Sequence, residues 1–457
     1  MHSALARIAE AADSRSAAGI AAAVNRLIKS GELTAGSRLP TVRVLAATLG
    51  TSPTTVSEAW RSLIRIGSVR TDGRNGSFVA DHQHREFPRR FWRIAGMAGE
   101  FTVDLSSGVP DPALLPTPAD LSGALRPRTE VSGYLDPPVL PALETLIRRS
   151  WRDIAEPDSV TVVDGSLDAV DRVLTSLVRL GDRVLVENPT FPPFLDLLEL
   201  IGADVLAVEV DAEGMRPERL RSALRNSPIA PTVLLIQPRA HNPTGASMSQ
   251  GRADELASIL KTHAPSCLVV EDDHVGDVAS SPPISLATRL PERTVLIRSF
   301  SKAYGPDLRL AALGGPAELI EPVIARRNLG PAWSPRLVQG LLCDMLADPG
   351  CRSVVARARE VYAKRRVALI DALASEGLVV EARDGFNLWV EVSQERDALV
   401  VLAAQGIGAA PGRPFVAGAL AGEHLRITTA SLDIGEAQRI GSALAAAARE
   451  RRGPLHR

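Results

Sequence analysis

The periodicity of the apolar residues changes near residue 100, and this change divides the chain into two unlike parts. Before it, apolar residues recur at every third or fourth position, as at Ile20, Val24 and Leu27, which predicts short amphipathic helices. After it, short apolar runs alternate with helix-length stretches, which predicts a largely parallel sheet covered by helices. We therefore expect a multidomain protein, with residues 1–80 as one domain, 81–100 as a linker and 101–452 as a second domain.

The N-terminal part is expected to contain three helices closed by a hairpin. The second helix spans Val42 to Leu49 and ends at Gly50, and Ser52 can cap the third helix, whose first residue is Pro53. Two short strands follow within residues 69–79, around a turn rich in Gly and Asn. This arrangement is mainly α with a small β element.

The charge is distributed unevenly between the two parts. Residues 1–90 hold 13 Lys and Arg against 7 Asp and Glu, a formal charge of +6, and the total of −1 leaves −7 on the remainder. A basic head on an acidic body is expected when only the head contacts phosphates. A single surface arginine is more simply a solvated charge, so the argument depends on the whole group.

Hydroxyl and basic side chains gather on this head. Short hydroxyl groups at the start of the third helix can reach bases or phosphates in a major groove, and arginines can neutralise phosphates nearby. The segment from Gly31 to Val79, with Gly31-Glu32-Leu33, Arg38-Leu39-Pro40 and Phe78-Val79, resembles the winged helix-turn-helix of the GntR family. The candidate DNA-binding residues are Arg38, Arg43, Ser52, Thr54, Thr55, Arg74 and Gly76. Pro53 departs from the polar residue frequent in that family, so the operator is not predicted.

The larger part carries its polar motifs where expected strands end. We expect strands at Val160–Val163, Arg183–Glu187, Val205–Val208, Thr232–Ile236, Cys267–Glu271, Thr294–Arg298, Arg309–Leu313, Phe386–Val392 and Leu425–Thr428, and helices such as Leu167–Leu180 and Arg252–His263. Three polar residues follow these strands. Lys302 offers an amine, Asp272 a carboxylate that can pair with a pyridine nitrogen, and Asn242 an amide that can bond a ring oxygen. Each motif alone has a simpler interpretation as a loop or turn, but together they predict a pyridoxal phosphate (PLP) site.

A phosphate group also has candidate partners. Backbone N–H groups in a loop between a strand and a helix can face an anion, and hydroxyl and guanidinium groups can complete its contacts. The candidates are Gly165, Ser166 and Leu167 in the loop, with Ser299, Ser301 and Arg309 on either side of the lysine. Phe191 can stack on the ring, although a core phenylalanine is an equally good interpretation.

Residues 101–452 resemble a fold-type I aminotransferase of class I/II, with a smaller C-terminal α+β subdomain. The resemblance implies that Lys302 forms the Schiff base with PLP and that Tyr134 reaches the phosphate of a partner subunit. It also implies that Arg426 binds the carboxylate of a substrate or effector. His274 departs from the tyrosine of most relatives, two positions after the aspartate, which puts transamination in doubt.

Together the two resemblances match the MocR subfamily of GntR regulators, and the motifs are most similar to its PtsJ-type branch, which is associated with vitamin B6 salvage. The chain is therefore expected to be a homodimeric regulator that binds operator DNA and senses PLP or an amino-acid-like effector. Two alternatives remain. One is an active PLP-dependent aminotransferase with an accessory DNA-binding head, and the other is a DNA-binding protein with a vestigial pocket.

Several other features bear on the protein's surroundings. The three cysteines, Cys267, Cys343 and Cys351, lack the spacing of metal ligands and do not suggest a disulfide framework. The first residues lack the apolar core of a signal peptide, and no apolar run approaches the roughly 20 residues of a membrane helix. We therefore expect a cytoplasmic protein without a metal or a membrane partner.

Overall fold

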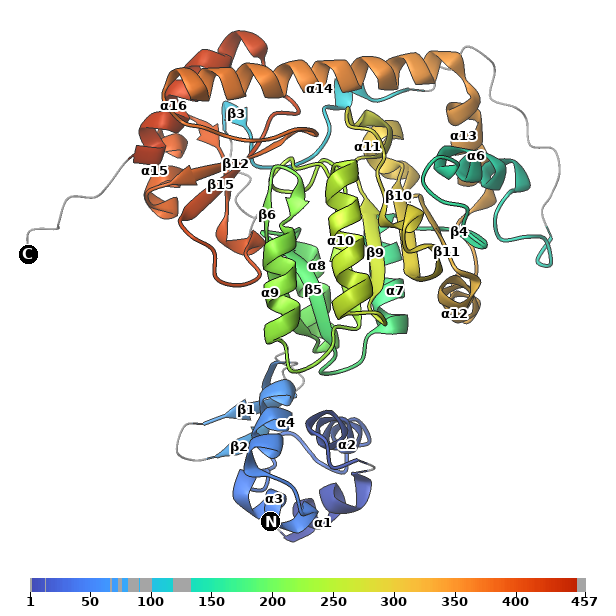
Figure 1. Ribbon diagram of the computed structural model, residues 1–457, viewed down its shortest axis with the longest axis vertical. Helices are drawn as coiled ribbons and strands as arrows, with labels where there is room; N and C mark the ends of the chain where they lie inside the picture. Colours follow the sequence, from blue (N-terminus) through green and yellow to red (C-terminus); the bar gives the residue numbers. More distant parts are fainter. Residues whose placement is uncertain are drawn as a thin grey trace, which may run out of the picture. The chain divides into compact units, whose positions relative to one another are not determined.

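The computed structural model describes residues 2–12, 14–65, 68–72, 76–80, 90, 101–117 and 133–449. Residues 2–80 form a small helical head. Its helices are α1 (His2–Ala11), α2 (Ala17–Lys29), α3 (Val42–Leu49) and α4 (Pro53–Arg65), and its strands are β1 (Val69–Thr71) and β2 (Ser77–Val79). The two strands pair antiparallel, with Val69 opposite Val79, and form a short wing (Figure 1).

Local chemistry sets the helix ends in the head. Ser16 and Thr41 cap α2 and α3 by accepting hydrogen bonds from Gly19 N and Val44 N. Gly50 ends α3 in the left-handed conformation, with φ at +62°, which glycine adopts without steric cost. Ser52 accepts from Thr55 N at 3.1 Å at the start of α4. Helix α1 was not among the predicted elements; Ala4 and Ile8, one turn apart, bury its inner face.

The head has its own apolar core. Side chains of α2, α3 and α4 meet in it, together with Val69 and Val79 from the two strands. Ile20, Val24, Val56 and Leu63 are completely buried, which confirms the helical periodicity expected from the sequence.

The body is built on an eight-stranded sheet in the order β4-β11-β10-β9-β8-β5-β6-β7. Its strands are β4 (Ser159–Val163), β5 (Arg183–Asn188), β6 (Asp204–Asp211), β7 (Gly214–Met215), β8 (Val233–Ile236), β9 (Leu268–Asp273), β10 (Thr294–Ser299) and β11 (Ala311–Gly315). Strands β8, β9 and β10 run parallel, whereas β11 pairs antiparallel with both β10 and β4. The residues that follow β8, β9 and β10 therefore meet at one edge of the sheet.

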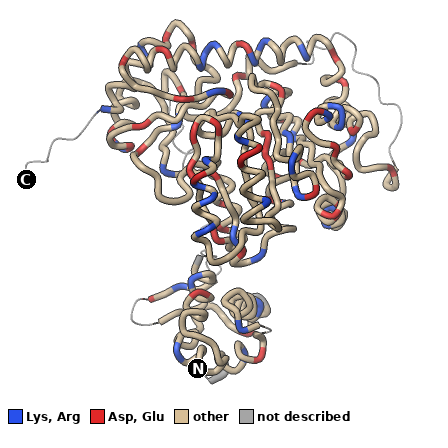
Figure 2. Tube along the Cα trace, in the orientation of Figure 1, with Lys and Arg blue, Asp and Glu red and all other residues tan. Residues whose placement is uncertain are grey.

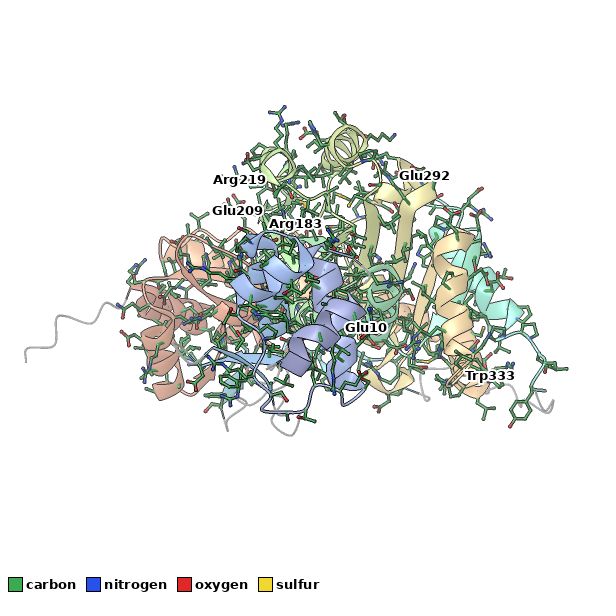
Figure 3. The ribbon with its side chains drawn as sticks, turned by 90° about the horizontal axis from the view of Figure 1, so that it is seen from below. Glu10, Arg183, Glu209, Arg219, Glu292 and Trp333 are labelled. Atoms are coloured by element: carbon green, nitrogen blue, oxygen red, sulfur yellow. The ribbon has the colours of Figure 1, made fainter. Side chains whose placement is uncertain are left out.

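Helices cover this sheet, and α9 and α10 lie side by side on one of its faces (Figure 1). The helices around the sheet are α6 (Pro141–Trp151), α7 (Ser166–Leu177), α8 (Pro192–Ile201), α9 (Pro217–Asn226), α10 (Gln250–His263), α11 (Ser301–Tyr304), α12 (Ala317–Arg327) and α13 (Arg336–Ala347). On the outer surface, Glu209 of β6 pairs with Arg219 of α9 at 3.2 Å (Figure 3).

The long helix α14 (Pro349–Ser375) runs across the body to a smaller C-terminal subdomain (Figure 1). That subdomain contains β12 (Asn387–Val392), α15 (Glu395–Ala404), β13 (Ile407–Gly408), β14 (Ala410–Pro411), β15 (Glu423–Thr428) and α16 (Ala437–Arg449). Its sheet has the order β12-β15-β14, and β13 pairs in parallel with β3 (Val103–Asp104). A chain segment from before the large sheet thus joins the small subdomain.

The predicted strands all occur, with small differences at their ends. The strand expected from Arg309 begins at Ala311, because Arg309 itself is left-handed, with φ at +45°, after a short 3-10 turn. Acidic and basic residues alternate along the chain trace of the body in Figure 2. Within the described ranges, every helix is too short or too polar to cross a membrane.

Candidate cofactor and DNA sites

Lys302 lies in α11, immediately after β10, and its side chain points into the body. Its Nζ atom donates to the carbonyl oxygen of Gly108 at 3.0 Å and lies 5.8 Å from the centre of the Phe386 ring. Burial lowers the pKa of Lys302 to about 8, and the positive charges of Arg426 and Arg309 act in the same direction. A lowered pKa makes the neutral, nucleophilic amine accessible near neutral pH.

Asp272, near the end of β9, and Asn242, after β8, lie at the same edge of the sheet as the lysine. Gln237 connects them: its Nε2 donates to Asp272 Oδ2 at 3.0 Å, and its Oε1 accepts from Asn242 N at 2.9 Å. Burial raises the pKa of Asp272 to about 7, while Gln237, Ser166 and the charge of Lys302 act against that increase. A cationic partner at its free oxygen would therefore favour the carboxylate.

His274 follows β9 and is buried beside the lysine. Burial lowers its pKa to about 3, and the positive charge of Lys302 contributes to the decrease. The imidazole is therefore neutral at physiological pH, so one ring nitrogen can donate a hydrogen bond and the other can accept one. The titration near neutrality that the sequence suggested for this histidine is removed by its burial.

The candidate phosphate contacts gather at the N-terminus of α7. Gly165 has φ at +107°, and a side chain there would meet the Arg309 guanidinium, since the nearest atom, Nη2, would lie 2.7 Å from an added Cβ. The same guanidinium donates to the carbonyl oxygen of Asp164 at 3.3 Å. Backbone N–H groups at the start of a helix and an adjacent guanidinium form an anion-binding arrangement. The Ser299 side chain is buried, and its hydroxyl oxygen accepts from Ser301 N at 3.4 Å.

Arg426 in β15 acts on Lys302 and belongs with it to the group of residues that we call the pocket, together with Asp272, Asn242 and His274. Its guanidinium lies 5.4 Å from the centre of the Phe415 ring and donates to the carbonyl oxygen of Ser106. The side chain is almost fully buried, and burial lowers its pKa to about 10, although Asp104 opposes the decrease. A buried guanidinium close to Lys302 can bind a ligand carboxylate through two parallel hydrogen bonds.

Several buried polar atoms in this pocket have no hydrogen-bond partner. In a protein interior such atoms are rare, and a cluster of them indicates a polar ligand or ordered water. Within the described residues they are Asn242 Oδ1, Asp272 Oδ1, His274 Nδ1, Ser301 Oγ and Arg426 Nε. The pocket residues therefore fit a ligand that carries both hydrogen-bond donors and acceptors.

Two predicted residues contact other aromatic side chains in the single chain. Tyr134 is 90% exposed, and its ring contacts Trp333, edge to face, at 6.0 Å. Trp333 lies at an outer edge of the body in Figure 3. Phe191 packs edge to face against Phe194 at 5.3 Å. An exposed Tyr134 is free to serve another subunit, but its role stays a prediction.

In the head, the structure brings Arg38 to the wing. Arg38 bridges to Phe78 of β2, and its Nε would lie 3.3 Å from a Cβ added to Gly76. Arg43 on α3 and Thr54 on α4 are exposed. Thr55 is partly buried, and its hydroxyl group forms a hydrogen bond with that of Ser52. The hydroxyl of Ser52 is used as the cap of α4. Arg74 lies outside the described residues.

Comparison with known proteins covers both parts of the chain. Residues 16–79 match the family described as bacterial regulatory proteins, gntR family, and residues 102–444 match aminotransferase class I and II. The vitamin B6 salvage pathway transcriptional repressor PtsJ of Salmonella typhimurium is 34% identical over 428 residues, which cover 93% of this chain and 96% of PtsJ. The chain belongs to the MocR-type family of GntR transcriptional regulators.

Other relatives agree with this membership. The transcriptional regulator TauR of Rhodobacter capsulatus is 28% identical over 85% of this chain and 87% of TauR. The crystal structure of the α-aminoadipate aminotransferase LysN of Thermus thermophilus, complexed with N-(5'-phosphopyridoxyl)-L-leucine, superimposes with a TM-score of 0.68. It is 23% identical and covers 78% of this chain and 93% of LysN. The body of this MocR-type regulator thus has the fold-type I aminotransferase fold.

Sequence reasoning had missed several residues of this regulator's pocket. Gly108 and Ser106 enter it from a loop near β3, and Phe386 enters from the small subdomain. Nothing local in the sequence indicated these, because they come from distant segments. Gln237 had a usable signal, since it is a polar residue directly after the apolar strand β8.

Proposed function

We propose that this MocR-type regulator binds PLP at Lys302 and that occupancy of the pocket changes the affinity of its head for operator DNA. The observation that carries the proposal is a set of unpartnered buried polar atoms at the edge of the sheet where the partly buried Lys302 lies. Asp272 Oδ1, His274 Nδ1 and Asn242 Oδ1 are all buried without partners. Asp272 and His274 interact electrostatically with the Lys302 amine, whose pKa is lowered to about 8. A substituted pyridine with a phosphate group and an aldehyde fits these donors and acceptors.

The roles of the residues follow from their chemistry. When bound, PLP supplies an aldehyde that reacts with an amine and a ring that withdraws electrons. Lys302 would provide the amine, Asp272 would hold a proton on the ring nitrogen, and Asn242 and His274 would bond the ring oxygen. Backbone N–H groups of Gly165, Ser166 and Leu167 would bind the phosphate with Ser299, Ser301 and Arg309, and Phe191 would cover the ring.

The assembly is part of the proposal. We place the DNA-binding domain at residues 1–80, the linker at 81–100 and the PLP-binding domain at 101–452. A homodimer would let the exposed Tyr134 reach the phosphate in the neighbouring subunit. In the head, Arg38, Arg43, Arg74 and the wing at Gly76 would contact DNA phosphates, and Thr54 and Thr55 would face the major groove. The protein would act in the cytoplasm, where operator DNA is found.

The signal is proposed to be PLP itself, or PLP together with an amino-acid-like effector. PtsJ is named as a repressor of the vitamin B6 salvage pathway, which supports a signal from B6 metabolism. The buried guanidinium of Arg426 supports a carboxylate-bearing effector. A ligand changes DNA affinity only if it binds two conformations of the protein with different affinity.

A titration by fluorescence anisotropy tests this proposal. The purified protein is titrated against its own upstream DNA and a scrambled duplex at fixed ionic strength, with and without PLP, because phosphate contacts make the affinity depend on salt. We expect specific binding whose Kd shifts with PLP in the wild type but not in Lys302→Ala. The control Lys261→Ala, an exposed lysine on α10, should respond like the wild type. An identical shift in Lys302→Ala would contradict covalent sensing at this residue.

A working aminotransferase is the second candidate, because Arg426 lies in the same pocket as Lys302 and could hold a substrate carboxylate. A single-turnover reaction with an amino acid distinguishes the two functions. Stable conversion of the cofactor to pyridoxamine phosphate with release of a keto acid would favour the enzyme. Retention of the original absorption spectrum would favour the regulator.

A further inference from the structure

Gln237 is a buried residue directly after β8, and its side-chain amide bonds two residues of the pocket. Its Nε2 donates to Asp272 Oδ2 at 3.0 Å, and its Oε1 accepts from Asn242 N at 2.9 Å. Its backbone N–H donates to Glu187 Oε2 at 2.8 Å. The side chain is 2% exposed, so water does not replace these partners.

These bonds determine which way the amide points. The backbone N–H of Asn242 requires an acceptor, so the oxygen of Gln237 faces it and the NH2 group faces Asp272. In a reversed amide, the NH2 group would face the Asn242 N–H, so that two donors meet, and the amide oxygen would face Asp272 Oδ2, so that two acceptors meet. Both mismatches would leave buried polar groups without partners, which disfavours the reversed orientation.

The consequence for Asp272 is that its two oxygens are no longer equivalent. Oδ2 is occupied by Gln237, whereas Oδ1 is buried and has no partner. The same glutamine fixes the backbone of Asn242, whose side-chain Oδ1 is also unpartnered. One side chain thereby sets the position of two pocket residues that are far apart in the sequence.

We propose that Gln237 is a positioning residue that holds Asp272 and Asn242 in register with the pyridine ring of PLP and reserves Asp272 Oδ1 for the ring nitrogen. This inference rests on the proposed PLP binding. The side-chain hydrogen bonds of Gln237 go to Asp272 and Asn242 and not to Lys302. It acts through the two residues that it bonds.

A buried carboxyl group fixes the backbone of Gln237. Glu187, which accepts from the Gln237 backbone, is buried and lies 3.4 Å from His241 Nε2. His241 Nδ1 is in turn 2.8 Å from Thr244 Oγ1. Asp273 raises the pKa of Asp272, whereas Gln237, Ser166 and Lys302 lower it.

The test uses Gln237→Met, which keeps the size of the side chain and removes both hydrogen bonds. Without the donor, Asp272 takes up a proton more readily and supports a protonated ring nitrogen less well. A ring that carries less positive charge would raise the pKa of Lys302 Nζ in the covalently loaded protein. We expect the pH midpoint of the cofactor's visible absorption change to rise by about 0.5–1 unit. We also expect the Kd of PLP to increase about 3- to 10-fold.

A second variant and a matched control keep the test decisive. Gln237→Asn shortens the side chain by one methylene, so that its amide no longer reaches both partners, and it should move the midpoint in the same direction. Gln339 is a fully buried glutamine whose side-chain amide hydrogen-bonds backbone groups, including Leu140 N and the Pro138 carbonyl oxygen. Gln339→Met should lower the melting temperature while leaving the midpoint unchanged.

The outcomes separate the two proposals. If the wild type takes up no covalently attached PLP, the proposed function and this inference both fail. If the wild type shows the spectrum and both Gln237 variants keep its midpoint, or if Gln339→Met moves it equally, only the positioning role is overturned. Should Gln237→Met not fold, as judged by its thermal melt, the polar variant Gln237→Asn decides the result alone.

Discussion

The carbonyl oxygen of Gly108 accepts a 3.0 Å hydrogen bond from Lys302 Nζ, although the two residues are far apart in the sequence. The same glycine lies against Arg426, whose guanidinium occupies the space that a side chain at position 108 would take. Gly108 therefore contacts both the amine and the candidate carboxylate-binding group. With φ at +67°, it also has a backbone conformation that favours glycine.

Replacing Gly108 should displace Arg426. In Gly108→Ala the new methyl group overlaps the guanidinium, so we expect the melting temperature to fall by an amount that corresponds to about 1–3 kcal/mol. Affinity for a carboxylate-bearing ligand should fall about tenfold or more, measured as the Kd of an amino acid by spectral titration. Gly377→Ala is the control, since Gly377 has φ at +78° but its nearest neighbour, Arg449 Nη2, lies at 3.6 Å. Equal losses of affinity in both variants would argue against the overlap.

Attachment of PLP to Lys302 should depend on pH in a specific way. The neutral amine is the nucleophile, and burial with nearby positive charge lowers the pKa of Lys302 to about 8. As pH rises, the rate of attachment should increase about tenfold per unit below pH 8 and become constant above it. Stopped-flow absorbance between pH 6 and pH 9.5 measures this. A rate that still climbs steeply above pH 9 would indicate an ordinary, solvated lysine.

Glu187 should make the protein less stable as pH rises. Burial raises the pKa of Glu187 to about 8, above its ordinary value of 4.5, so the folded state holds a proton that the unfolded state releases. The free energy of unfolding therefore decreases between about pH 4.5 and pH 8 and is not affected by this group beyond that range. In Glu187→Gln that loss is absent.

We therefore expect the stability of Glu187→Gln relative to the wild type to increase by about 1–3 kcal/mol from pH 5 to pH 8. Urea denaturation at these two pH values, with and without the substitution, gives the difference. If the two proteins keep the same stability difference at both pH values, the buried, protonated state of Glu187 is wrong.

Arg38 should contribute to DNA binding without reading sequence. It is exposed and lies beside the wing at Gly76, so its guanidinium is placed to contact phosphate. In Arg38→Ala, affinity for operator and scrambled DNA should fall by similar factors. The slope of log K against log salt should decrease by about 1. Arg219→Ala, which alters an exposed arginine of the body, should leave both unchanged, and a selective loss of operator binding would assign Arg38 to base recognition instead.

The sequence alone determined much of this protein, because the relevant signals are local. The three- and four-residue spacing in the head, the cap at Ser52 and the stop at Gly50 predicted helices that the structure contains. Alternating apolar strands and helices predicted the covered sheet. Parallel strands bring the polar residues at their ends to one edge of the sheet. The sequence alone therefore groups Lys302, Asp272 and Asn242.

Only the tertiary structure decided the pKa values of these groups. Burial of His274 removes its titration near neutrality, and burial of Lys302 beside Arg426 lowers the pKa of its amine, but neither desolvation nor a distant charge is encoded in a local pattern. The contributions of Gly108 and Gln237 likewise depend on contacts made after folding. Spacing along the chain selects the elements, whereas the electrostatics of the pocket arise from segments that meet only when the chain is folded.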